Sequence, residues 1–405
     1  MMREKPVPWR QWGEELVDDR AIQQMRNACT LPVAVRGALM PDAHPGYGLP
    51  IGGVLALEDA VIPYAVGVDI ACRMRLSILD MPVSALVSRR EALIRAIEQE
   101  TRFGIGAKFE SAQRRTHQVM DEDWSINDIT HANKNNAWKQ LGTSGGGNHF
   151  VEFGELHIAS PAEIGGQPLE KGVCLAFLSH SGSRKTGEMV AGHYSKLAMS
   201  LRPDLPQEVK HLAWLELSSE AGAEYWGAME LMGRYAAANH ELIHAHVLQN
   251  LGAAVIAHVE NHHNFAWREE YDGKELIVHR KGATPAQAGV EGIIPGSMAS
   301  AGFVVRGKGH SDSLNSCSHG AGRAMSRAAA LATINQDEAA TCLREHDINL
   351  LSGSLDEAPM AYKDIHAVMA AQTDLVEILA RFEPRLVKMA PGAPRHVPRK
   401  KRKRG

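Results

Sequence analysis

Four short apolar runs along the chain have the length and composition of buried strands. They span residues 52–57, 173–178, 276–278 and 303–305. Four longer segments carry apolar residues at helical spacing and separate or follow these runs. They span residues 83–100, 189–201, 218–252 and 360–381. The alternation predicts an α/β fold in the broad sense that includes α+β. Because no fixed-period repeat or obvious linker divides the chain, we expect one catalytic domain over 1–392.

The composition is that of a soluble globular protein. Its 405 residues are 44% hydrophobic and 22% charged, enough to bury a core without disulfide staples. No apolar run reaches the length of a membrane span, and the N-terminus lacks a hydrophobic signal core, so we expect a cytoplasmic protein. The five cysteines are odd in number and scattered, which indicates reduced thiols.

The charge is unevenly distributed. The formal net charge is −3, yet residues 393–405 carry seven lysines and arginines and no acid. The body of the chain is therefore acidic and the C-terminal tail is basic. Such a tail either attracts a phosphate backbone or is a solvated, disordered extension.

Several side chains could bind a metal ion. Asp69 and Cys72 are three residues apart, and a turn after Gly67 would let both reach one ion. Imidazoles beside glycine or small polar residues occur at His149, at His180 and in the pair 262–263. Singly, each is more often a core or surface residue; together they suffice for one or two divalent ions. Ligand softness alone favours zinc.

The histidines of segment 218–252 support a metal site less well. His240 and His244 are one helical turn apart and could share an ion. Their surroundings are those of a good helix, so we interpret them as part of an ordinary amphipathic face.

Phosphate binding is suggested by three segments rich in glycine and small residues, at 181–184, 292–298 and 320–323. The sequence contains neither the G-x-x-x-x-G-K-[ST] loop nor a K-x-D-G lysine nucleophile. His319 is therefore the candidate nucleophile, because imidazole can form a labile phosphoramidate. Asp42 lies in segment 40–53, which we predict to be an irregular loop, and could orient a hydroxyl or support a metal ligand.

With these residues assembled, the chain resembles the RtcB family of RNA-splicing ligases over nearly its whole length. The segments that carry the resemblance are MPDAHPGYGLPIGG, VGVDIACRM, GTSGGGNHF, SHSGSR, HHNF, RKGA, GIIPGSM, SCSHGAGR and PMAYKDI. It implies one large domain with central β-sheets flanked by helices and an active site in a loop-rich cleft.

The resemblance also implies an activity. The family joins RNA ends bearing a 2′,3′-cyclic phosphate or 3′-phosphate to a 5′-hydroxyl, using GTP and Mn²⁺, in RNA repair or tRNA splicing. Water activated by metal opens the cyclic phosphate; GMP passes from a histidine to the 3′-phosphate; the 5′-hydroxyl then displaces GMP. We follow the family and expect two Mn²⁺ ions in place of zinc. An activating partner such as archease is compatible with the resemblance.

The resemblance implies roles residue by residue. The metal ligands are Asp69, Cys72 as the bridging ligand, His149, His180 and His263. His319 becomes guanylylated, and Asp42 lies near the reacting ends. The GTP contacts are Asn148, Phe150, Glu152, Asn264, Ser297, Gly320, Ala321, Gly322, Tyr362 and Lys388. The contacts to RNA or phosphate are Arg184, Lys281, Arg323 and Arg327.

Two features depart from the family pattern. Ala71 and Arg73 stand where many relatives have glycine, so Arg73 either contacts substrate phosphate or points to solvent. The chain also continues for seventeen residues after Lys388. These departures leave three rival hypotheses: an enzyme that caps 3′-phosphate ends of RNA or DNA without sealing, a metallophosphoesterase without nucleotide transfer, and a non-catalytic binding protein that uses the basic tail, which the intact donor set disfavours.

Overall fold

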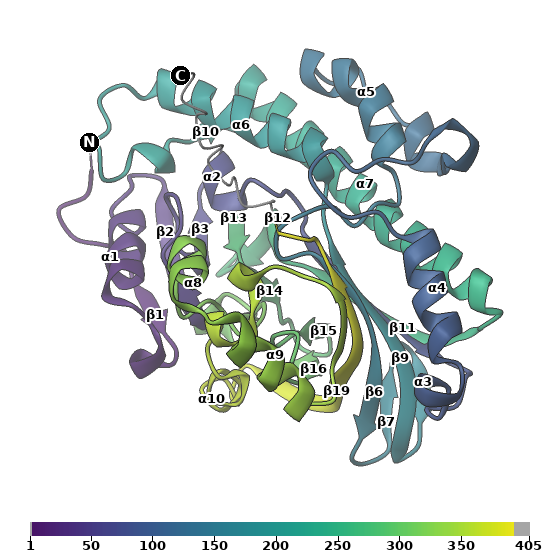
Figure 1. Cartoon of the computed structure of the whole chain (residues 1–405). Coiled ribbons are helices and arrows are strands. Elements are labelled where there is room, and N and C mark those ends of the chain that lie inside the picture. The colour runs from purple at the N-terminus through teal and green to yellow at the C-terminus, as the bar shows by residue number, and fades with distance from the viewer. Residues whose placement is uncertain (1, 393–405) are drawn as a thin grey trace, which may run out of the picture.

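Two twisted β-sheets meet at the centre of the computed structural model, which describes residues 2–392 (Figure 1). The predicted basic tail, 393–405, lies outside the described residues. The larger sheet has the strand order β11-β5-β9-β6-β19-β16-β15, and β18 pairs with β19. Its strands are β5 (Arg73–Leu79), β6 (Phe150–Ile158), β9 (Gly172–Ser181), β11 (Val255–His262), β15 (Glu291–Ile294), β16 (Gly302–Gly307), β18 (Asn349–Ser352) and β19 (Val376–Met389).

The larger sheet curls until it is nearly closed. The Asn261 side chain on β11 accepts a hydrogen bond of 2.9 Å from the Ile293 backbone N–H on β15, the strand at the other end of the order. The concave face encloses one apolar cluster that includes Leu76, Leu178 and Phe382. The curl therefore gives the sheet a core of its own.

The second sheet has the order β1-β2-β3-β13-β12. Its strands are β1 (Trp9–Gln11), β2 (Ala34–His44), β3 (Ile51–Leu57), β12 (Asn264–Tyr271) and β13 (Lys274–Lys281). Three two-stranded pairs complete the β-structure. They are β4 (Ala60–Val61) with β10 (Leu215–Glu216), β7 (Ala162–Ile164) with β8 (Gln167–Leu169), and β14 (Ala283–Pro285) with β17 (Ser316–Ser318).

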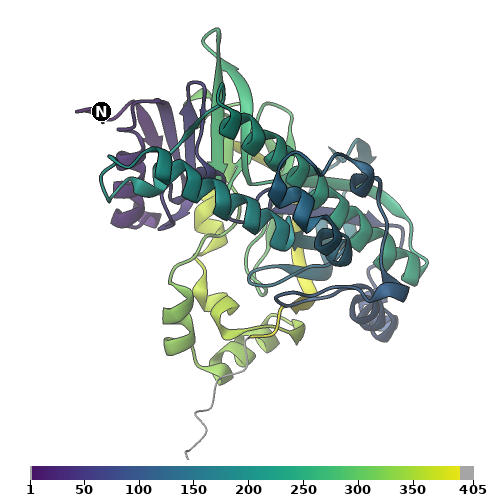
Figure 2. The ribbon, with the colours of Figure 1, turned by 90° about the horizontal axis from the view of Figure 1, so that it is seen from above.

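Helices cover the convex face of the larger sheet. The longest, α7 (Glu220–Leu251), is capped by the Ser219 hydroxyl and ends at Gly252 in the left-handed region. It packs with α4 (Arg90–Glu100) on β6 and β9. Figure 2 shows α6 (Arg184–Leu201) and α7 crossing the top of the molecule, with the N-terminal sheet to one side. The remaining α-helices are α1 (Asp19–Ala28), α2 (Pro63–Val66), α3 (Ala85–Ser88), α5 (Asp128–Gln140), α8 (Arg327–Thr333), α9 (Gln336–Glu345) and α10 (Ile365–Ala370).

The structure confirms the four predicted strands and the long helix, and it corrects other elements. Segment 83–100 contains two helices, α3 and α4, separated at Arg89. The prediction of one helix over 360–381 is wrong, because α10 is short and β19 begins at Val376 between β6 and β16. Segment 40–53 is only partly a loop, since β2 continues to His44 and β3 begins at Ile51. In segment 360–381, pairing of β19 with distant strands overrides the local pattern, whereas in segment 40–53 β2 and β3 pair with each other across the loop.

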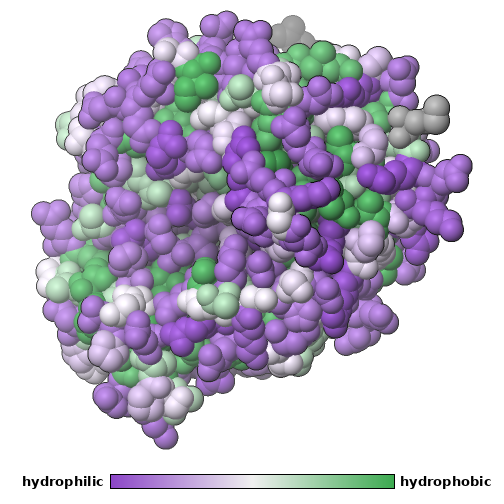
Figure 3. All heavy atoms as spheres, turned by 180° about the vertical axis from the view of Figure 1, so that it is seen from behind, coloured by the Kyte–Doolittle hydropathy of each residue, from purple (hydrophilic) through white to green (hydrophobic). Residues whose placement is uncertain are grey.

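Within residues 2–392, no helix combines the length and the apolar character that crossing a membrane requires. Seen from behind, polar side chains separate the apolar patches of the surface (Figure 3).

Candidate active site

Four neighbouring strands of the larger sheet bring donor atoms to one edge. β11 ends at His262, β5 begins at Arg73, β9 ends at Ser181 and β6 begins at Phe150. Antiparallel neighbours alternate in direction, so these four ends lie at the same edge. The residues at or next to them are Cys72, His149, His180 and His263.

The donor atoms converge closely. Cys72 Sγ lies 3.0 Å from His180 Nε2 and 3.4 Å from His149 Nε2. Asp69 Oδ2 lies 2.9 Å from His149 Nε2, and His263 Nε2 lies 3.4 Å from His180 Nε2. The turn predicted after Gly67 exists, because the Cys72 N–H bonds the Asp69 carbonyl at 3.2 Å. All five predicted ligands therefore meet in one cluster, in which Asp69 is partly exposed and the other four are buried.

Backbone carbonyls contact one ring nitrogen of two imidazoles in this cluster. His149 Nδ1 lies 3.0 Å from the Ser144 carbonyl, and His180 Nδ1 lies 3.1 Å from the Asn148 carbonyl. A carbonyl only accepts, so His180 Nδ1 carries the proton and His180 Nε2 directs a lone pair into the cluster. His149 Nε2 faces the Asp69 carboxylate at 2.9 Å. The Arg184 guanidinium donates to the Ser144 carbonyl and also lies 3.1 Å from His149 Nδ1.

The electrostatics of the cluster fit a metal centre. Burial, with Asp69 adding to it, raises the pKa of the Cys72 thiol well above its ordinary value. Burial also lowers the pKa of His180 to about 3, so its imidazole is neutral as a ligand must be. The carboxyl of Asp69 has a lowered pKa, because His149 and Arg184 outweigh its burial. A divalent ion would supply the positive charge that the thiolate needs.

His319 lies beside this cluster, and its Nδ1 is hydrogen-bonded to Asp42. It follows β17, and its ring centroid lies 5.0 Å from that of His263. The fully buried Asp42 accepts hydrogen bonds from His319 Nδ1 at 2.6 Å and from the His319 backbone N–H at 3.1 Å. Burial acts to raise the Asp42 pKa, but His319, Lys363 and His44 bring it below its ordinary value. The ionised carboxylate thus fixes the tautomer that leaves Nε2 free.

We call the five ligand side chains the donor cluster. A cavity of ≈ 400 Å³ opens in front of His319 and this donor cluster. Most of the predicted GTP contacts line it, as do three of the predicted phosphate contacts. They are Asn148, Phe150, Glu152, Asn264, Ser297, Gly320, Ala321, Gly322, Tyr362, Lys281, Arg323 and Arg327. The structure thus assembles residues that are more than two hundred positions apart in the sequence.

Two predicted contacts lie elsewhere. Lys388 faces away from the cavity, because its neighbours on β19, Val387 and Met389, line the cavity and successive strand residues point to opposite faces. Its ammonium pairs with Glu98 at 3.0 Å. Arg184 lines a second hollow of ≈ 240 Å³ on the other side of Asp69. The donor cluster thus lies between two open spaces, both of which Asp69 lines.

Two residues that the sequence did not single out organise the cavity wall. Glu357, 2% exposed, accepts hydrogen bonds from Arg323, Arg327 and the Tyr362 hydroxyl. Lys363 donates to the Ala43 carbonyl at 2.7 Å, next to Asp42. Lys363 belongs to the PMAYKDI segment and Glu357 lies two residues before it, so the density of charged residues there was the available signal.

Glu152 is a buried carboxyl at the cavity that has no hydrogen-bond donor from the protein within the described chain, unlike Glu357. Burial raises the pKa of its carboxyl to about 8, from an ordinary 4.5. Between these two pH values the folded state binds a proton that the unfolded state releases, so the group destabilises the fold progressively as pH rises.

Glu152→Gln should therefore increase the free energy of unfolding. The gain should be absent below pH 4.5 and grow as pH rises, to roughly 5 kcal/mol above pH 8. Urea denaturation of wild type and variant across this range measures the difference. A pH-independent difference would contradict the assignment.

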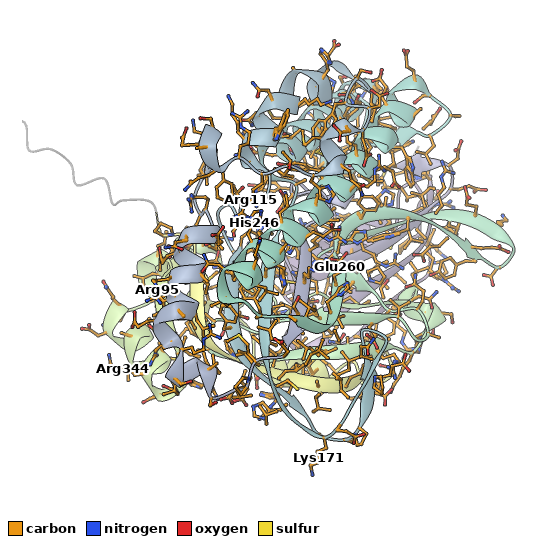
Figure 4. The ribbon with its side chains drawn as sticks, turned by 90° about the vertical axis from the view of Figure 1, so that its right-hand side faces the viewer. Arg95, Arg115, Lys171, His246, Glu260 and Arg344 are labelled. Atoms are coloured by element: carbon orange, nitrogen blue, oxygen red, sulfur yellow. The ribbon has the colours of Figure 1, made fainter. Side chains whose placement is uncertain are left out.

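Arg73 is neither at the substrate nor in solvent, so both predicted placements are wrong. Its guanidinium is buried, and donates to Glu260 at 3.0 Å and to the Gly233 carbonyl of α7 at 3.2 Å. Arg75 donates to the same carboxylate at 2.9 Å. Figure 4 shows Glu260 beside α7. Ala71 adopts the left-handed conformation, with φ 54°, that glycine adopts more easily.

Glu260→Ala should destabilise the fold by about 2 kcal/mol, because it leaves two largely buried guanidinium groups without their counterion. Glu275→Ala is the matched control, since Glu275 pairs with Arg268 at the surface and its loss should cost less than about 0.5 kcal/mol. Urea denaturation at pH 7 measures both. Equal effects would contradict the structural role of Glu260.

His240 and His244 of α7 do not belong to the donor cluster. His240 Nδ1 bonds the Ser179 hydroxyl at 2.7 Å, and His244 bonds Ser179 and Ser77 at 2.9 Å and 2.8 Å. Both rings are buried against the larger sheet. They are core residues, as their helical setting indicated.

Comparison with known proteins extends these observations. The family described as "tRNA-splicing ligase RtcB" matches residues 24–389. The RNA-splicing ligase RtcB of Escherichia coli (strain K12) is 32% identical over 403 residues, which cover 92% of this chain and 95% of that protein. The tRNA-splicing ligase RtcB of Nanoarchaeum equitans is 32% identical over 440 residues, covering 92% of each chain. That of Thermococcus kodakarensis is 28% identical and covers 92% of this chain and 91% of its own.

Proposed function

The chain belongs to the RtcB family and is an RNA ligase, and from that premise we propose that it joins RNA ends bearing a 3′-phosphate or 2′,3′-cyclic phosphate to 5′-hydroxyl ends, through a guanylylated His319. GTP supplies the guanylyl group and Mn²⁺ the metal. The observation that carries this proposal is the free Nε2 of His319, held by Asp42 at the wall of a cavity that also holds the donor cluster.

His319 is set to accept GMP. Its Nε2 attacks the α-phosphorus of GTP, a P–N bond forms, and pyrophosphate leaves with the electrons of the broken P–O bond. The ring gains positive charge as the bond forms, and the Asp42 carboxylate on Nδ1 stabilises that charge. Asp42 therefore both orients the ring and supports the phosphoramidate.

Two further transfers complete the reaction. An oxygen of the RNA 3′-phosphate attacks the phosphorus on His319, which breaks the P–N bond and gives an RNA end activated as 3′-pp-5′-G. The 5′-hydroxyl of the second RNA then attacks the RNA phosphate, and GMP leaves. Arg323 and Arg327 line the cavity and supply the cationic groups that hold these phosphates.

Asp69, Cys72, His149, His180 and His263 would hold the metal. Divalent ions bound there would stabilise the negative charge that develops at phosphorus. The residues themselves position the site, because backbone carbonyls fix the orientation of two of the imidazoles.

Glu152 is suited to recognise guanine. Guanine presents two adjacent donors, N1–H and the N2 amino group, and their approach would favour the ionised form of the Glu152 carboxyl, which accepts both hydrogen bonds. Phe150 and Tyr362 line the same cavity and can pack against the base. Glu152→Gln should therefore weaken GTP binding by about tenfold or more while it stabilises the fold.

The proposal is tested with RNA. Wild-type protein, GTP and Mn²⁺ are incubated with one labelled RNA carrying a 3′-phosphate and a second carrying a 5′-hydroxyl. Joined product is the expected result. Accumulation of 3′-pp-5′-G ends without joined product would instead identify an end-capping enzyme, and loss of the phosphate without nucleotide transfer would identify a phosphoesterase.

A further inference from the structure

Three aromatic rings form a group at the cavity, which we call the aromatic platform: Tyr47, Tyr64 and His211. Ring centroids of Tyr64 and His211 are 5.0 Å apart, those of Tyr47 and His211 5.9 Å, and those of the two tyrosines 6.4 Å. Tyr47 and Tyr64 both line the cavity that holds His319. Tyr47 is 69% exposed, so its ring is presented to solvent and does not fill the core.

The backbone that carries Tyr47 is fixed. Its carbonyl accepts a hydrogen bond from the buried ammonium of Lys281. The neighbouring Gly46 exchanges two hydrogen bonds with the Gln24 side chain, with the Gly46 N–H donating at 3.0 Å. A Cβ at Gly48, whose φ is +71°, would lie 2.9 Å from the His211 carbonyl, so the loop packs tightly on the segment carrying His211. The ring is thus exposed but its support is rigid.

The platform continues into the reaction centre. Tyr64 lies on α2, five residues before Asp69, and Tyr47 lies five residues after Asp42. Lys281, which holds Tyr47, lines the cavity together with His319. Tyr47 and Tyr64 therefore border the same cavity as His319, and the exposed ring of Tyr47 lies where this cavity meets solvent.

Resting on the proposed function, we infer that the aromatic platform stacks an unpaired nucleobase at an RNA end held in the cavity. An exposed, rigidly supported aromatic ring is the recurring device for binding single-stranded nucleic acid, since every base has a π-face. The guanine of GTP is the weaker candidate, because Glu152, Phe150 and Tyr362 already provide donor recognition and packing for it. The base belongs either to the 3′-phosphate strand or to the 5′-hydroxyl strand.

The test compares Tyr47→Leu, which keeps an apolar side chain, with Tyr47→Phe, which keeps the ring. Each is assayed for sealing with intact RNA pairs, with the 3′-terminal nucleotide abasic, and with the 5′-terminal nucleotide abasic. Tyr47→Leu should raise the KM for one RNA strand by about tenfold, on the scale of base–aromatic stacking, and Tyr47→Phe should match wild type. For wild type, removing the terminal base from that strand should raise the KM by the same factor. For Tyr47→Leu, removing the base should not raise the KM any further.

Each other outcome has a defined meaning. An unchanged KM in Tyr47→Leu, or an abasic penalty equal in wild type and Tyr47→Leu, would overturn the inference. A fall in the extent of guanylylation with GTP alone would assign the ring to guanine and also overturn it. Failure of wild type to become guanylylated or to seal RNA would refute the proposed function itself, which is a separate result.

Discussion

His319→Ala should abolish sealing of 3′-phosphate and 5′-hydroxyl RNA ends, with a loss on the order of 10⁴-fold or more, as expected for removal of a covalent nucleophile. The cause is the loss of Nε2, the atom that accepts GMP. The fold should persist, because the His319 ring lies on the wall of an open cavity and its removal creates no closed void in the core. Sealing is measured by gel separation of labelled RNA.

The matched control is His346→Ala, which removes an exposed imidazole beyond α9. It should seal at the wild-type rate. A second assay uses chemically activated RNA that already ends in 3′-pp-5′-G, so that the guanylylation of His319 is not needed. His319→Ala should join this RNA, and failure to do so would mean that the substitution damages the later step or the fold.

Asp42→Asn should lower the rate of guanylylation by about 10³–10⁴-fold, the range found when an acid that orients a histidine becomes an amide. One Asp42 oxygen accepts from both the Nδ1–H and the backbone N–H of His319, and its charge balances the imidazolium. The amide keeps the shape but removes the charge. Single-turnover transfer from labelled GTP measures the effect, and Asp312→Asn, which alters an exposed surface pair with Arg10, should have none.

The same substitution predicts a pH-dependent change in stability. Because the folded state lowers the Asp42 pKa below its ordinary 3.8, the ionised carboxylate stabilises the fold above that pH and the contribution is lost as pH falls through the lowered value. Asp42→Asn should therefore destabilise the protein at pH 7, and the difference from wild type should narrow in strong acid. A difference that widens on acidification would contradict the assigned charge state.

The identities of the chemical groups could be predicted from the sequence, because they stand in motifs with unusual local composition. Asp69 and Cys72 follow Gly67, His149 and His180 lie beside polar residues, and the structure places the four donors together. The direction in which each side chain points was harder to predict. It depends on strand pairing between residues far apart in the chain, which no local pattern encodes.

Lys388 and Arg73 illustrate the limit. Segment 376–381 reads as the end of a helix, so the alternation that turns Lys388 away from the cavity could not be applied to it. Arg73 is buried only because Glu260, on the next strand, and the Gly233 carbonyl on α7 accept its hydrogen bonds. A local rule for surface arginines misses such partners.

The covalent state of His319 tests the account most directly. Wild-type protein is incubated with α-labelled GTP and Mn²⁺, without RNA, and the label is followed on denatured protein through acid and alkali. We predict one label per chain, lost in acid, retained in alkali as a phosphoramidate is, and absent from His319→Ala. A wild-type protein that carries no label, or a label that persists in His319→Ala, would contradict the account.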